Sequence, residues 1–278
     1  MIQITDREFT ELVEFMQKNY GINLINKRQL IEGRMSNLLE KKGMKTFSEY
    51  IALIKKNNME EITTLINKLT TNHTFFYRED NHYKFLKDVI LPEQEKNNKT
   101  KIMNIWSAGC SSGEEPYTTA MAIDDYFGLK KAQWNAKILA TDISQNVLGK
   151  AAEAIYQEDG IKNLPPTWKT KYLKKIDGGK YQIVPQIKNE VQFKIFNLMD
   201  PMPLAYKNKF HLIFCRNVMI YFNQKTKNDL INRLYEAVQP GGYLFIGHSE
   251  TVQRDQSNFK YICPAIYQKV WYYGYKKN

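Results

Sequence analysis

Metal-binding and disulfide-forming residues are scarce in this chain of 278 residues, which has three cysteines and four histidines. The cysteines (Cys110, Cys215 and Cys263) are odd in number and widely spaced, and they match no zinc pattern. No apolar run approaches the roughly 20 residues of a membrane span. Acidic residues in the first twenty positions argue against a secretory signal. These absences predict a soluble, cytoplasmic protein without a structural disulfide or a bound metal.

The common phosphate-binding motifs are also missing. The chain contains neither GxGxxG nor the Gly-Lys-Ser/Thr of a P-loop. In their place stands KIMNIWSAGCSSGEEPYTT (residues 101–119), which reads as a strand, a loop of small residues and a helix that begins at Glu114 and Glu115. Two carboxylates at a helix start repel phosphate and suit a cationic ligand group. The loop therefore favours a ligand other than a nucleotide phosphate.

An acidic residue also follows the next apolar run of the α/β pattern. Residues 137–141 read as a buried strand that ends at Asp142. In doubly wound α/β folds the ligand lies over the carboxyl ends of the strands, where such an acid can accept both ribose hydroxyls. S-adenosylmethionine carries a ribose diol, an ammonium and a sulfonium, and no phosphate, so the pattern suits it. With Gly109 and Gly113 alone, an ordinary turn in some other α/β protein would be an equal alternative.

The first 70 residues predict a helical domain. Residues that can cap a helix precede three apolar stretches, at Thr5 or Asp6, at Asn26 and at Thr46, and a fourth helix is expected at about 60–69. The second helix has a basic polar side with Arg28, Arg34, Lys41 and Lys42. Together with the net charge of +11, this basic side of the helix is suited to binding an acidic partner. The alternative, and the more common case for such a pattern, is a helix face that is only solvated.

The remainder of the chain alternates strands and helices. The connection TTNHTFFYRE (residues 70–79) is too aromatic for a flexible linker and is expected to be ordered. At about 160–190 a Gly-Gly turn between short apolar runs predicts a β-hairpin inserted into the parallel pattern. We therefore expect a helical domain at 1–70, a linker with a connecting helix at 71–91, and an α/β domain at 92–278 that contains the insertion. This order of parts resembles a class I S-adenosylmethionine-dependent methyltransferase: an α/β fold with a Rossmann-like sheet, a small antiparallel β insertion and a preceding all-α domain.

Four motifs narrow the resemblance. SAGCSSGEEPYT, TTNHTFFYRE, ATDIS and IFCRNVMIYF together resemble the CheR family, the methyltransferases of bacterial chemotaxis receptors, and the resemblance covers essentially the whole chain. It implies methyl transfer from S-adenosylmethionine to receptor glutamates, giving glutamate methyl esters and S-adenosylhomocysteine. It also implies a protein that acts on cytoplasmic receptor helices, needs no metal or nucleic acid, does not insert into the membrane and works as a monomer.

The resemblance also implies a set of site residues. Those that would contact the methyl donor are Asn72, Thr74, Arg78, Gly109, Glu115, Asp142, Asn197, Leu198, Arg216, Asn217 and Val218. Within this set Glu115 would hold the methionine ammonium and Asp142 the ribose. Arg78 and Tyr221 would be catalytic, and Arg28, Arg34, Lys41 and Lys42 would dock the acidic receptor.

Physical chemistry gives the catalytic pair a positioning role. A glutamate has a pKa of about 4.3 and is ionised at neutral pH, so it needs orientation and no general base. A guanidinium can hold one carboxylate oxygen while the other attacks. As alternatives, Arg78 could be an interdomain ion pair, Tyr221 a core aromatic residue and Asp142 a helix cap. A nucleic-acid methyltransferase lacks support, because Arg216-Asn217-Val218 replaces its Asn/Asp-Pro-Pro-aromatic run; a non-catalytic cofactor-binding scaffold is the other alternative.

Overall fold

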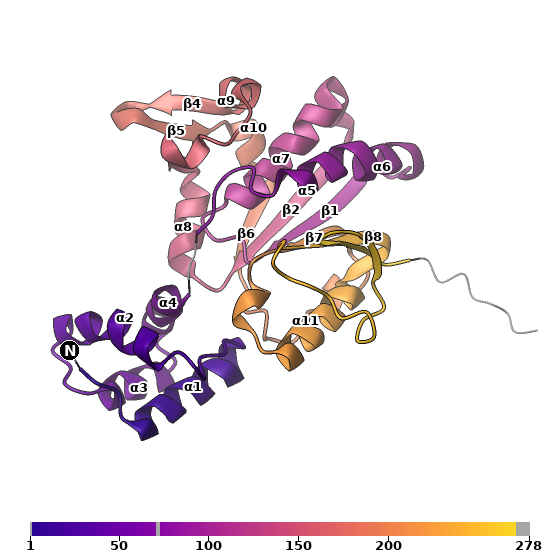
Figure 1. The fold of residues 1–278 in the computed structure, drawn as a ribbon. Coiled ribbons are helices and arrows are strands. Elements are labelled where there is room, and N and C mark those ends of the chain that lie inside the picture. The colour runs from indigo at the N-terminus through magenta and orange to yellow at the C-terminus, as the bar shows by residue number, and fades with distance from the viewer. Residues whose placement is uncertain (1, 71–72, 271–278) are drawn as a thin grey trace, which may run out of the picture. The chain divides into compact units, whose positions relative to one another are not determined.

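The computed structural model describes residues 2–70 and 73–270. The chain forms two compact units (Figure 1). The first comprises Met1–His73 and Tyr221–Lys227, and the second comprises Thr74–Ile220 and Asn228–Asn278. One unit is therefore built from two separate pieces of sequence.

The first unit contains the predicted helices α1 (Asp6–Tyr20), α2 (Arg28–Lys41), α3 (Phe47–Lys55) and α4 (Met59–Leu69). Thr5 caps α1 in a capping box with Glu8. The prediction that Asn26 caps α2 is wrong: the cap residue is Lys27, without a side-chain hydrogen bond. Asn26 is a central residue of a turn that is closed by a hydrogen bond from the Lys27 N–H to the Leu24 carbonyl. The helix therefore starts after this turn.

Residues from far along the chain complete this unit. Ile22 forms an isolated antiparallel bridge with Phe222, and Asn23 N–H donates to the Tyr221 carbonyl at 2.8 Å. Buried side chains on all four helices form the helical core, among them Met16, Met35, Phe47, Tyr50, Ile54 and Leu65. No local sequence pattern predicts that the helical unit pairs with residues 221–227.

The second unit is built on a seven-stranded sheet in the order β6-β2-β1-β7-β8-β10-β9. Its strands are β1 (Ile102–Ala108), β2 (Asn135–Asp142), β6 (Val191–Ile195), β7 (Phe210–Cys215), β8 (Val238–Ile246), β9 (Lys260–Cys263) and β10 (Ile266–Gln268). Strands β6, β2, β1, β7 and β8 are parallel, and β10 is antiparallel to both of its neighbours. The glycine loop therefore leaves the middle of the sheet, where parallel strands direct their carboxyl ends to one edge.

Helices cover the sheet, and a smaller sheet stands beside them (Figure 1). The helices are α5 (Asp80–Phe85), which continues through a π-helical turn (Leu86–Ile90) into α6 (Leu91–Asn97), then α7 (Glu114–Phe127), α8 (Gln145–Glu153), α9 (Pro166–Tyr172), α10 (Pro185–Lys188) and α11 (Gln224–Ala237). The small antiparallel sheet has the order β3-β5-β4, with β3 (Ile155–Gln157), β4 (Leu173–Ile176) and β5 (Lys180–Ile183).

A buried acid of α7 holds α9 and α10, the helices before β4 and after β5 of the small sheet. Asp124 of α7 accepts hydrogen bonds from Tyr172 Oη at 2.8 Å and Gln186 Nε2 at 2.6 Å. The predicted hairpin is confirmed, since β4 and β5 pair antiparallel across residues 177–179. The expected fold class is confirmed as well: an all-α part, a mostly parallel sheet and an antiparallel insertion. Among the described residues, no helix combines the length and the apolar character of a membrane span.

Candidate active site

The glycine loop between β1 and α7 is fixed to the end of the neighbouring strand. The N–H groups of Gly109 and Cys110 both donate to the Thr141 carbonyl, at 2.8 and 2.9 Å. Gly109 has a φ of 85°, and a Cβ there would stand 2.5 Å from Val218 Cγ2. The glycine is thus required by the backbone conformation and by the packing of Val218, which brings the loops after β1 and β7 together.

Asp142 lies at the carboxyl end of β2 and faces the same loop. Its Oδ2 accepts the Ser111 N–H at 2.9 Å and its Oδ1 accepts the Ser144 N–H at 3.0 Å. Burial raises the pKa of Asp142, and the backbone N–H groups of Ser144 and Ser111 counteract part of that rise. A carboxylate has about four acceptor positions, so both oxygens of Asp142 can still accept ligand hydroxyls.

Asn197 and Leu198, two of the residues predicted to contact the methyl donor, lie next to Asp142. The Phe196 N–H donates to the Asp142 carbonyl at 3.1 Å, which places Asn197 and Leu198 directly after this contact. Asn197 Oδ1 in turn accepts the Met199 N–H at 3.0 Å and fixes the turn. Leu198 is buried and Asn197 is half-buried. The carboxyl ends of β2 and β6 therefore present an acid, an amide and an apolar side chain together.

Glu115, in the first turn of α7, is held by two donors. Ser107 Oγ donates to its Oε1 at 2.7 Å, and Arg216 Nη1 donates to its Oε2 at 3.2 Å. Burial raises the pKa of Glu115, while the adjacent Arg216 and the Ser107 hydroxyl lower it. The carboxylate keeps unused acceptor positions and can accept an ammonium.

Arg216, at the end of β7, joins Glu115 to the linker. Its side chain is only 2% exposed. Nε donates to Glu79 Oε2 at 3.1 Å, and Nη2 donates to the Arg78 carbonyl. The guanidinium thus pairs with two carboxylates, and the three groups together carry one net negative charge. That balance suits a ligand with a single cationic group nearby.

The linker around Arg78 adopts an uncommon backbone. Tyr77 and Glu79, on either side of Arg78, have φ values of 62° and 58°. Such conformations cost about 1–3 kcal/mol each for residues other than glycine, and they persist only where surrounding contacts hold them. Here Tyr77 N–H donates to Thr118 Oγ1 at 3.2 Å, and Glu79 Oε1 accepts the His248 N–H at 3.2 Å. The backbone of Arg78 is therefore fixed on both sides.

A buried carboxylate that sequence reasoning missed shapes the loop after β7. Glu250 Oε2 accepts the N–H groups of Gly247 at 2.6 Å and Asn217 at 2.9 Å. Its Oε1 accepts the Ile220 N–H at 3.2 Å. Burial raises the pKa of Glu250, and these backbone donors lower it again in part. Glu250 thus determines the path of residues 217–220, including the Val218 that packs on Gly109.

Comparison with known proteins agrees with this geometry across the chain. Residues 72–267 match the model of the CheR methyltransferase SAM binding domain, and residues 7–70 match that of the CheR methyltransferase all-alpha domain. The chain belongs to the CheR methyltransferase family. It is an S-adenosylmethionine-dependent methyltransferase of chemotaxis, and the resemblance seen in its motifs is confirmed.

Individual relatives agree. The chain is 47% identical over 273 residues to a chemotaxis protein methyltransferase of Borreliella burgdorferi, with 96% of each chain covered. It is 34% identical to chemotaxis protein methyltransferase 1 of Pseudomonas aeruginosa, covering 89% of this chain and 91% of that one. Against the chemotaxis protein methyltransferase of Escherichia coli the identity is 32%, covering 96% and 92%.

The other residues predicted for this CheR-family site do not all belong to one unit. Tyr221 belongs to the first unit, whereas Arg78 belongs to the second. Thr74 is half-buried at the start of the second unit. Asn72 falls outside the described residues.

The predicted docking residues all lie in the first unit, and three of the four make contacts within it. Arg28 donates to the Ile4 carbonyl and pairs with Asp6. Arg34 donates to the Lys68 and Thr70 carbonyls. Lys42 pairs with Glu61 at 2.5 Å. Lys41 is exposed.

Among the described residues, Glu79, His82 and His248 form a group whose ligand atoms lie within 4.8 Å of one another, as a metal site requires. Arg216 already donates to Glu79 in that group, and its positive charge opposes a cation. Burial, with help from Arg216 and His248, lowers the pKa of His82 to about 2, so its imidazole is neutral. The group belongs to the Arg216 network, and the expectation of a metal-free enzyme stays a prediction.

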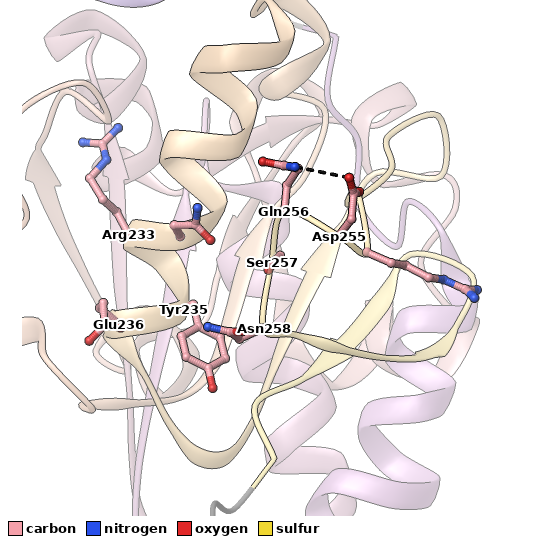
Figure 2. A pocket seen from close by; sticks show the side chains of 9 residues that line it. Arg233, Tyr235, Glu236, Asp255, Gln256, Ser257 and Asn258 are labelled. Atoms are coloured by element: carbon pink, nitrogen blue, oxygen red, sulfur yellow. Dashed lines mark hydrogen bonds between the residues drawn. The ribbon is translucent and has the colours of Figure 1, made fainter.

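A pocket of about 620 Å³ lies away from these strand ends. Figure 2 shows that its lining comes from α11 and the segment before β9. Glu236 of this lining accepts the Asn208 N–H through its carbonyl, just before β7 begins. The pocket therefore lies toward the amino ends of the strands, opposite the glycine loop. It is also mixed in charge, with Arg233 and Arg254 against Glu236 and Asp255.

Proposed function

We propose that this CheR-family enzyme methylates glutamate side chains on the cytoplasmic helices of chemoreceptors. When bound, S-adenosylmethionine supplies a methyl group that becomes bonded to a carboxylate oxygen, leaving S-adenosylhomocysteine and moving no proton. The observation that carries the proposal is the Arg216 network, because one guanidinium binds Glu115 and also holds the Arg78 backbone. A site for the donor's ammonium is thereby linked to the residue that would orient the acceptor.

The residues of the chain would divide the work as follows. Glu115 and Asp142 bind the ammonium and the ribose diol, and Asn197 with Leu198 flanks the base. Arg78 holds one oxygen of the receptor glutamate by charge-assisted hydrogen bonding. Tyr221 fixes the angle of the attacking oxygen. No residue is needed as a general base, because glutamate, with a pKa of about 4.3, is ionised at neutral pH.

Labelled methyl donor and chemoreceptor-containing membranes test the activity directly. Base-labile label that is released as methanol supports the glutamate ester. Label that resists base, or label on added RNA, would contradict the proposed substrate, and the absence of transfer would make the chain a non-catalytic binder.

Arg78→Ala tests the assignment of the orienting residue. Turnover should fall by more than about tenfold, as expected when a contact specific to the transition state is lost. Affinity for S-adenosylhomocysteine, measured by calorimetry, should remain within about twofold because Glu115 and Asp142 are intact. Arg254→Ala is the matched control, because Arg254 lines the pocket toward the amino ends of the strands, away from the glycine loop. Unchanged turnover in a folded Arg78→Ala protein would make Arg78 structural.

A further inference from the structure

Residues Tyr221–Lys227 follow β7 in sequence, yet they belong to the first unit. The chain leaves the second unit after Ile220 and returns to it at Asn228, within α11. The proposed catalytic tyrosine is the first residue of this excursion. Its surroundings are therefore supplied in part by the helical unit.

Three contacts join the excursion to the end of α1 and the turn after it. Asn23 N–H donates to the Tyr221 carbonyl at 2.8 Å. Ile22 and Phe222 pair as an antiparallel bridge, and their exposed fractions are 6% and 8%. Gln17 Nε2 donates to Thr226 Oγ1 at 3.1 Å. A main-chain bond, a buried apolar pair and a side-chain bond thus hold seven residues.

The turn after α1 is built for this pairing. Gly21 ends α1 with a φ of 70° and its N–H donates to the Gln17 carbonyl. This left-handed residue turns the chain away from the helix axis, so that Ile22 can pair with Phe222 and Asn23 with Tyr221. On the other side of Tyr221, Glu250 holds the Ile220 N–H. The main chain is thus fixed by the second unit at Ile220 and by the helical unit at Tyr221.

We propose that the turn Gly21–Leu24 positions Tyr221 for methyl transfer. The inference rests on the proposed role of Tyr221. The contacts at the Tyr221 carbonyl and at the neighbouring Phe222 fix the main chain that carries the phenol. Loosening the pairing frees the main chain, and a displacement of about 1 Å can lower a rate by about 10²-fold.

Ile22→Ala tests the proposal, with Ile54→Ala as the matched control. Ile54 is also buried in the helical core, but it lies on α3, which provides none of the three contacts. Ile22→Ala should lower kcat toward receptor membranes at least about tenfold and leave S-adenosylhomocysteine affinity within about twofold. Hydrogen exchange should become faster across residues 221–227 and at the Asn23 amide. Ile54→Ala should leave kcat and this local exchange as in the parent.

Gln17→Ala serves as the milder variant if Ile22→Ala does not fold, and it should move kcat and exchange in the same directions. Tyr221→Phe separates the two levels of the argument. If Tyr221→Phe turns over like the parent, the proposed role of Tyr221 fails, whatever the exchange data show. If Tyr221→Phe is slow but Ile22→Ala or Gln17→Ala speeds exchange at 221–227 without lowering kcat, the positioning proposal is overturned and the role of Tyr221 stands.

Discussion

At the scale of single residues, Arg216 links Glu115 of α7 to Glu79 and the Arg78 carbonyl of the linker. Burial by itself lowers the pKa of an arginine, but Tyr83, Glu115 and Glu79 raise that of Arg216 above its usual range. Its charge therefore persists at every pH at which the protein folds. A buried cation that is paired with two carboxylates avoids the large desolvation free energy of an isolated buried charge. Removing one of the carboxylates would leave part of that charge uncompensated and would destabilise the folded protein.

Asp142→Asn should keep the fold and weaken binding of the methyl donor. The amide keeps one acceptor oxygen but loses the charge, and a hydrogen bond to a charged group contributes about 1.5–3 kcal/mol. Calorimetry with S-adenosylhomocysteine measures the loss. Asp159→Asn is the control, since that side chain is 87% exposed. Equal affinity in Asp142→Asn and the parent would contradict the assignment of Asp142 to the ribose.

His82 gives the folded protein a sensitivity to acid. Its folded-state pKa of about 2 lies below the ordinary value of 6.5 because of burial. Between these two pH values His82 binds a proton in the unfolded chain but not in the folded protein. The free energy of unfolding therefore falls as the pH falls below about 6.5. The slope from this group approaches about 1.4 kcal/mol per pH unit.

His82→Phe should remove that contribution, because phenylalanine can keep the stacking on Phe245, whose ring lies 4.8 Å away. Denaturant unfolding from about pH 6.5 down to about pH 5, which lies inside that window, should show a flatter loss of stability in the variant. His73→Phe, at an exposed position, is the control. Parallel pH profiles for His82→Phe and the parent would show that His82 is not the source of the slope.

At the scale of elements, the loop after β7 is shaped by a residue outside it. Glu250 supplies two carboxylate oxygens to three backbone donors of residues 217–220 and 247. Gly247 has no room for a Cβ, which would stand 2.5 Å from Asn217 Nδ2. The loop and the end of β8 therefore form one packed element.

Glu250→Gln should loosen this element. The amide nitrogen would face a backbone N–H, so at least one charge-assisted bond is lost, and such a bond contributes about 1.5–3 kcal/mol to stability. S-adenosylhomocysteine affinity should fall as well, because Val218 would no longer be held against Gly109. Glu153→Gln, exposed on α8, is the control. A Glu250→Gln protein with parent stability and parent affinity would leave Glu250 without this role.

Elements with a local signature could be predicted from sequence, and contacts between distant elements could not. The glycine loop, Asp142 at a strand end and the caps at Thr5 and Thr46 each depend on a few consecutive residues. The partners of Arg216 lie 137 and 101 residues away, at Glu79 and Glu115. No periodicity encodes which buried charge meets which across such a separation. The miss at Asn26 has a different cause, since a turn competed for a good capping residue.

At the scale of the whole molecule, a net charge of +11 suits the acidic receptor helices that we propose as substrate. Because Arg28, Arg34 and Lys42 contact their own unit, charge reversal there would disturb folding together with docking. Lys41 and Lys45 are exposed and offer a cleaner test. Individual exposed ion pairs contribute only about 0–1 kcal/mol, so the effect should lie in encounter more than in final affinity.

Reversing Lys41 and Lys45 to Glu should raise the Michaelis constant for receptor membranes and flatten its dependence on salt, because long-range attraction is screened within about 10 Å at 0.1 M salt. Affinity for S-adenosylhomocysteine should not change. Reversing the exposed Lys96 and Lys99, near the amino ends of the strands, changes the net charge equally and is the control. If both double variants behave alike, the basic side chains at the end of α2 and after it are only solvated.

The two-piece make-up of the helical unit restricts how related genes can be recombined. A hybrid joined only near residue 73 would take residues 1–73 from one parent and Tyr221–Lys227 from the other, although these segments pack together in one unit. Each parent's Ile22 and Gln17 counterparts would then meet foreign partners at the bridge and at the Thr226 position. Exchange of the whole helical unit between family members therefore requires three crossover points, near residues 73, 220 and 227, so that the short second piece moves together with the first.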